Sequence, residues 1–132
     1  MAGFSPASGA RAYVNVGLET GVASAHPHRL IQMLFDGALL AVARAKRAMA
    51  DGEIALRGES ISKAIQIIDE GLKAALVDTG SDLAGNLRAL YEYMSCRLLV
   101  ASLKNESAAL DEVTRLLTDI KEAWNAIDPD KR

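Results

Sequence analysis

The stretch that decides the fold is SISKAIQIIDEGLKAALV, residues 60–77. Its larger apolar side chains recur at steps of three and four, as on one face of an α-helix: Ile61, Ile65, Ile68, Leu72 and Leu76. A second set with helical spacing consists of Ala64, Ile67, Gly71 and Ala74. Together the two sets cover an arc of about 200° around the helix, whereas a surface helix usually needs only ~100°. The helix must therefore be covered from two directions.

Two interpretations of this wide apolar arc remain open. In the first, two neighbouring helices of the same bundle cover it. In the second, the flank that contains Ala64, Ile67, Gly71 and Ala74 is a shallow trough that receives a helix of another protein. Apolar side chains of a neighbouring helix, such as Tyr91 and Leu99, which lie outside that helix's core stripe, would then complete the trough.

The composition favours a single all-α domain. The chain has 132 residues, enough for one core, and half of them are hydrophobic while only 5% are aromatic. The 15 basic and 17 acidic residues give a net charge of −2, which argues against a nucleic-acid partner. We find no apolar run of the ~18 residues that span a membrane, and no signal peptide. The single cysteine, Cys96, permits no internal disulfide and fits a reducing cytosol.

Apolar periodicity and helix-end signals predict four helices, at about residues 27–50, 53–78, 81–104 and 107–128. Ser81 is a good N-cap for the third helix, Asn105 is a break after it, and Trp124 should close one end of the core. Helices of about 20 to 25 residues with short connections imply an antiparallel up-down-up-down four-helix bundle over residues 25–132.

Residues 1–24 differ in composition from the rest of the chain, because they are rich in glycine and serine, include a proline, and have few periodic apolar residues. We expect a mobile N-terminal arm here. Tyr13 and Val16 are three residues apart and would share one side of a short helical turn. The hypothesis is that they rest over the empty trough as a lid.

The sequence offers no candidate catalytic, cofactor or metal site. A di-metal bundle needs a Glu-x-x-His pair, which is absent, as are glycine-rich phosphate loops and nucleophile motifs. His26 and His28 have no third ligand nearby, and Cys96 has no histidine placed to activate it. The sequence therefore predicts a protein that is not an enzyme.

Four sequence blocks in order resemble the FliS family of flagellar export chaperones. They are RAYVNV at 11–16, HPHRLIQMLFDGAL at 26–39, SISKAIQIIDEGLKAAL at 60–76, and NLRALYEYM at 86–94, which is followed by RLL at 97–99. The likeness covers nearly the whole chain. One departure is AHPH at 25–28, where the family pattern has a serine or threonine directly before the proline.

The resemblance implies a four-helix bundle in the bacterial cytoplasm that binds the disordered C-terminal segment of flagellin. Such proteins prevent premature polymerisation of flagellin and aid its delivery to the flagellar type III export apparatus. Family members also contact the membrane export-gate protein, some bind an anti-sigma factor, and the arm tyrosine matches Tyr13. The resemblance implies no nucleic-acid partner and no insertion into the membrane.

Two other classes of protein stay open at this point. One is a structural bundle that forms a homodimer through the same apolar flank and has no export role. The other is an enzyme or cofactor-binding bundle, which the missing ligands disfavour.

Overall fold

The computed structural model describes residues 27–76 and 81–127. Within these ranges the chain forms four helices and no strand: α2 (Pro27–Ala50), α3 (Ile54–Gln66), α4 (Asp82–Lys104) and α5 (Ser107–Ala126). α3 continues directly into η2 (Ile67–Lys73), a π-helical segment. The prediction of an all-α four-helix protein is confirmed.

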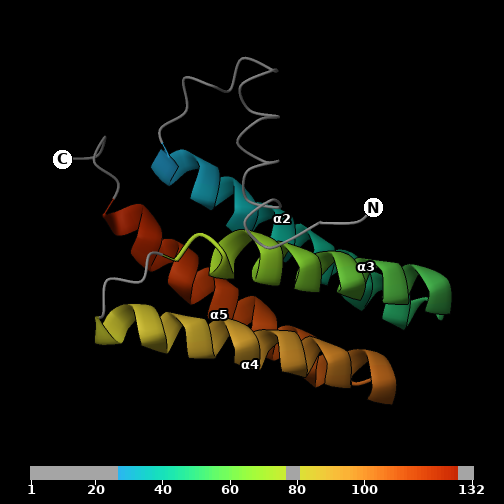
Figure 1. Cartoon of the computed structure of the whole chain (residues 1–132). Helices are drawn as coiled ribbons and strands as arrows, with labels where there is room; N and C mark the ends of the chain where they lie inside the picture. The colour runs from blue at the N-terminus through green and yellow to red at the C-terminus, as the bar shows by residue number, and fades with distance from the viewer. Residues whose placement is uncertain (1–26, 77–80, 128–132) are drawn as a thin grey trace, which may run out of the picture.

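The chain reverses direction at each connection, as Figure 1 shows: α2 and α4 run one way, and α3 and α5 run the other way. α2 packs against α3 and α5, and α4 packs against α5 and the α3–η2 helix. Neighbours in sequence are therefore neighbours in space, and the helices enclose one core.

The core is built from the apolar stripes that the periodicity predicts. Its largest fully buried side chains are Phe35 and Val42 from α2, Ile61, Ile68 and Leu72 from α3–η2, Met94 and Leu98 from α4, and Leu110, Val113 and Leu117 from α5. Burying one Leu- or Ile-sized side chain contributes about 1.5 to 3 kcal/mol, so this cluster is the main source of stability.

The predicted helix boundaries around α4 have the expected chemistry. The Ser81 hydroxyl caps the helix by accepting a hydrogen bond from the Ala84 N–H at 3.3 Å. Asn105 ends it in the left-handed conformation, with φ of 53°. Asparagine tolerates the left-handed conformation better than most residues, so it can end the helix here at little cost in backbone strain.

Much of the wide apolar arc within residues 60–76 is covered by the chain's own helices. Ile68 and Leu72 face the core, and Ile67 is also buried. Gly71 approaches α2 so closely that a methyl group there would lie 3.1 Å from Leu34 Cδ2. Of the two interpretations, the one in which neighbouring helices of the same bundle cover both flanks is therefore correct at Ile67 and Gly71.

The π-helical segment is a feature that the sequence did not predict. A π-helical turn contains more residues than an α-turn, so side chains in η2 point in directions that α-helical spacing does not give. Within it, the Asp69 carboxylate accepts a hydrogen bond from the Ser95 hydroxyl at 2.8 Å, and Lys73 lies 3.6 Å from Glu92. Both contacts fasten η2 to α4.

Candidate functional site: an apolar basin at one end of the bundle

A basin of about 470 Å³ opens at the end of the bundle where α2 begins and α5 ends. All four helices contribute to it through residues that are almost entirely apolar. They are Ile31, Phe35, Leu72, Ala75, Leu76, Leu83, Leu87, Tyr91, Asp119, Ile120, Ala123, Trp124 and Ile127. Antiparallel packing places the start of α4 and the end of α5 side by side here, which brings residues from distant parts of the chain together.

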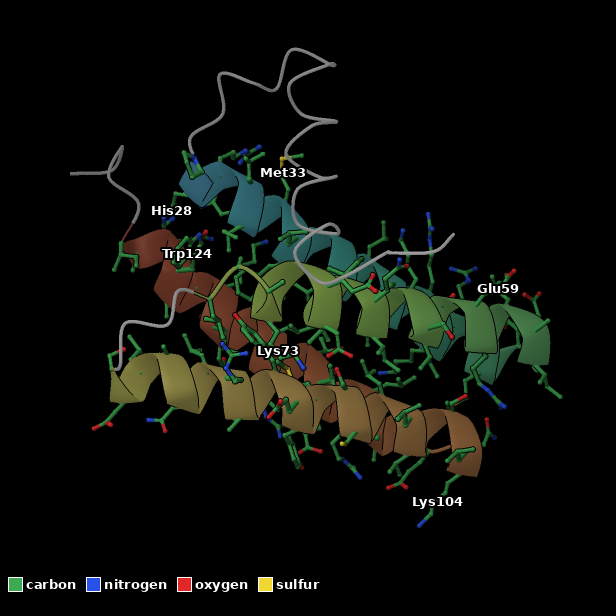
Figure 2. All side chains as sticks on the ribbon, viewed as in Figure 1. His28, Met33, Glu59, Lys73, Lys104 and Trp124 are labelled. Carbon is green, nitrogen blue, oxygen red and sulfur yellow. The ribbon has the colours of Figure 1, made fainter. Side chains whose placement is uncertain are left out.

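Two aromatic rings fix one wall of the basin. The imidazole of His28 on α2 stacks on the indole of Trp124 on α5, with ring centroids 4.3 Å apart and planes inclined by 7°. The indole N–H also donates to the His28 carbonyl oxygen at 2.9 Å. Figure 2 shows the two side chains meeting between the helix ends. This contact holds α5 against α2, as the prediction that Trp124 closes one end of the core requires.

The floor of the basin includes a buried aromatic side chain. Tyr91 contributes to it and is only 3% exposed, and burial raises the pKa of its phenol to about 12. A shift in this direction arises because an apolar environment disfavours the phenolate. The basin therefore favours apolar side chains over charged ones.

The rim of the basin presents apolar side chains to water. Leu83 at the start of α4 is 68% exposed, and Ile127 beyond the end of α5 is more than half exposed. Among the described residues that line the basin, Asp119 alone has a charged side chain. The arrangement can bind an apolar segment, and these described residues include no pair of groups suited to acid–base or nucleophilic chemistry.

A second groove, of about 480 Å³, lies between α2 and α3. Its lining is more polar: Gly37, Leu40, Ala41 and Arg44 come from α2, and Leu56, Glu59, Ser60, Lys63 and Ile67 come from α3–η2. Leu40 and Leu56 are exposed at its edge, while Ile67 forms part of its floor. This groove is a weaker candidate for an apolar ligand because three charged side chains line it.

The predicted trough residues do not form one surface. Ala64, Ile67 and Tyr91 are each at most 3% exposed. Gly71 is also buried, and Ala74 is half-buried. Tyr91 reaches the basin, Ile67 reaches the groove between α2 and α3, and Leu99 points into solvent on α4. Ala64, Ile67 and Gly71 are buried against the chain's own helices, so they do not line one continuous open trough, and their contact with a client stays a prediction. Tyr13 and Val16 lie outside the described residues.

Sequence reasoning missed most of the basin. Four of its lining residues have the spacing of ordinary core positions on a helix: Leu83, Leu87, Ile120 and Ile127. This spacing does not distinguish a helix end that is packed in the core from a helix end that is exposed to solvent. One signal was available. Leu83 and Ile127 lie at or beyond helix ends, where a stripe can extend past the last core layer.

The described part of the chain contains no group of three or more His, Cys, Asp or Glu side chains that could hold a metal ion. No helix within it is long and apolar enough to cross a membrane.

Comparison with known proteins identifies the family. Residues 9–131 match the family model described as flagellar protein FliS. The chain is 51% identical over 124 residues to flagellar secretion chaperone FliS of Salmonella typhimurium, covering 93% of this chain and 92% of the relative. It is 47% identical over 116 residues to FliSB of Pseudomonas aeruginosa (87% and 91% covered) and 33% identical over 106 residues to FliS of Bacillus subtilis (80% and 78%). The chain therefore belongs to the FliS family of flagellar secretion chaperones.

Proposed function

We propose that this protein is a cytoplasmic export chaperone for flagellin, and that the basin takes apolar side chains of flagellin's disordered C-terminal segment. Family membership supports a chaperone role in flagellar export. The observation that carries the client site is the basin itself, which is apolar, open to solvent and built from all four helices.

The energetics of such binding are favourable. A disordered segment loses about 2 to 5 kcal/mol on ordering, whereas each buried Leu- or Ile-sized side chain returns about 1.5 to 3 kcal/mol. Several anchors of this kind, in the basin and along the adjoining surface, would reach the roughly 8 kcal/mol that corresponds to micromolar affinity. A preformed basin lowers the cost further, because only the client must become ordered.

In this proposal, the chaperone covers the apolar side chains of flagellin's C-terminal segment, and this prevents premature assembly. While its apolar C-terminal side chains are held, flagellin cannot use them to polymerise, and the complex can be delivered to the flagellar type III export apparatus. The membrane export-gate protein and an anti-sigma factor are further partners in this proposal. The protein acts without catalysis and without a cofactor, and nucleic acid is not a partner.

Replacing Leu83 by aspartate tests the client site. We expect Leu83→Asp to weaken binding of a flagellin C-terminal peptide at least tenfold in isothermal titration calorimetry, because a charge at the rim opposes apolar binding. Ile54→Asp is the matched control, since Ile54 is exposed to the same degree (69% against 68%) and lines neither groove. Both variants should keep the circular dichroism spectrum of the parent.

Leu40→Asp separates the two grooves. Leu40 is exposed on the groove between α2 and α3, so this change should leave peptide binding intact if the basin is the client site. Loss of binding in Leu40→Asp alone would move the client site to that groove. A parent protein that binds no flagellin peptide and only self-associates would instead support the structural-bundle alternative.

A further inference from the structure

Asp119 on α5 combines two properties that set it apart from the rest of the basin lining. It carries the one charged side chain among the described residues that line the basin, and it is exposed to solvent. In a pocket of this kind the apolar lining supplies most of the affinity, and the few polar groups supply the specificity. Asp119 is therefore the lining residue that can distinguish one apolar segment from another by its charge.

A second carboxylate on α5, that of Glu112, shows how the bundle neutralises such a group. Glu112 lies seven residues before Asp119, which is two helical turns and therefore the same side of the helix. α4 supplies it with two donors. The Tyr93 hydroxyl donates to one carboxylate oxygen at 2.6 Å, and the Arg97 guanidinium donates to the other at 2.7 Å. Glu112 is thus fully engaged within the chain.

Antiparallel packing explains why Asp119 has no such partners. A step of seven residues forward on α5 corresponds to a step of about seven residues back on α4, which leads from the Tyr93 and Arg97 positions to Asn86 and Leu90. Neither of these side chains carries a positive charge. No ion pair joins Asp119 to Arg115, one turn earlier on α5, or to any other described residue. The carboxylate is therefore available to a cation from a bound partner.

We propose that Asp119 makes the basin selective for apolar segments that carry a lysine or arginine beside their apolar anchors. The inference rests on the proposed function, since it takes the basin as the client site, and it adds the charge that the client must bring. A cationic head can meet the Asp119 carboxylate in water while the apolar stem of the same side chain lies along the lining. A segment with an acidic residue at that place is repelled, so the basin discriminates against acidic segments of equal hydrophobicity.

The exposure of Asp119 sets the size of the expected selectivity. An ion pair between exposed side chains strengthens binding by up to about fivefold, and a like-charged pair weakens it by a similar factor. Exchanging a lysine of the bound segment for a glutamate should therefore weaken binding about tenfold. The difference should shrink in about 1 M salt, where the Debye length falls to about 3 Å.

Two synthetic peptides that differ only in charge test the selectivity on the full-length chain. Both are amphipathic helices with leucine at helical spacing and no tryptophan, and one carries lysine where the other carries glutamate. Trp124 is the only tryptophan of the chain and lines the basin, so its fluorescence reports binding there. The parent should bind the lysine peptide about tenfold more tightly than the glutamate peptide. Asp119→Asn should reduce this ratio to about twofold, and Asp119→Lys should reverse the preference.

Glu122→Gln is the matched control. Glu122 is exposed on α5 three residues after Asp119 and does not line the basin. Glu122→Gln and Asp119→Asn change the net charge of the protein by the same amount. A general attraction between the protein and the lysine peptide would therefore respond equally to both variants, whereas the proposal requires a response to Asp119→Asn alone. Both changes are on the surface, so circular dichroism should match the parent.

A flagellin C-terminal peptide measured in parallel separates this inference from the proposed function. If the flagellin peptide fails to bind while the lysine peptide keeps its advantage, the client is wrong and the selectivity of the basin stands. If the flagellin peptide binds while the two synthetic peptides have equal affinity, the client stands and the selectivity is overturned. Two further results overturn it: neither synthetic peptide changes the fluorescence of Trp124, or Glu122→Gln lowers the preference as much as Asp119→Asn does.

Discussion

Tyr91, on the floor of the basin, is 3% exposed, and burial raises the pKa of its phenol to about 12. In the unfolded chain a tyrosine loses its proton near pH 10. The folded protein therefore binds this proton more tightly than the unfolded chain does. The contribution of Tyr91 to stability is complete below about pH 10 and is lost as the pH rises from about 10 to 12.

This titration predicts a difference between the parent and Tyr91→Phe. Across that alkaline window the parent should lose about 2 to 3 kcal/mol of unfolding free energy that the variant does not lose. Urea unfolding of both proteins at a series of pH values measures it. If the unfolding free energies of the two proteins change with pH in the same way, the phenol of Tyr91 is not shielded from solvent.

Gly71 is a position where a single methyl group should be destabilising. A Cβ there would lie 3.1 Å from Leu34 Cδ2, and Leu34 is buried and cannot move aside freely. Overpacking costs about 1 to 3 kcal/mol, while helix propensity returns about 1 kcal/mol, so Gly71→Ala should lose about 1 kcal/mol net. Gly58→Ala is the control, because its Cβ would meet nothing within 4 Å and should stabilise the helix. Equal stability changes in the two variants would contradict close packing of η2 on α2.

At the scale of elements, the α3–η2 helix shows where packing overrides local pattern. Its two apolar sets need cover from two directions, and α2 and α4 both pack against this helix. Periodicity could not reveal the π-helical turn of η2, because the apolar spacing was matched to the α-helical period and a π-helical turn departs from that period.

Ile67→Asp tests whether Ile67 is a core residue that the chain's own helices cover. Ile67 is 3% exposed, so the variant would bury an unpaired carboxylate and lose about 3 to 5 kcal/mol. Chemical denaturation should show the loss, and Ile54→Asp at an exposed site should stay within about 0.5 kcal/mol of the parent. A stable Ile67→Asp protein that has lost only client binding would restore the trough interpretation.

At the scale of the whole molecule, the arm of residues 1–24 remains a hypothesis, since it lies outside the described residues. Apolar side chains such as Tyr13 and Val16 would cover client surface at the cost of ordering the arm, leaving a net lid energy of about 1 kcal/mol. Deleting Met1 to Ser24 should then tighten binding of a flagellin peptide by about five- to tenfold in calorimetry. Unchanged affinity would mean a passive tail, and weaker affinity would mean that the arm belongs to the client site.

The sequence by itself determined the helices, their ends at Ser81 and Asn105, and the antiparallel order of the bundle, because these follow from periodicity, capping chemistry and short connections. Its sequence blocks also determined the family. The tertiary structure alone decided which apolar residues are core and which are surface. Tyr91 reads as lying off the core stripe and is buried, whereas Leu83 reads as core and is exposed at the basin rim. Both outcomes depend on where neighbouring helices begin and end, and helical spacing records the direction of a side chain but not the neighbour that it meets.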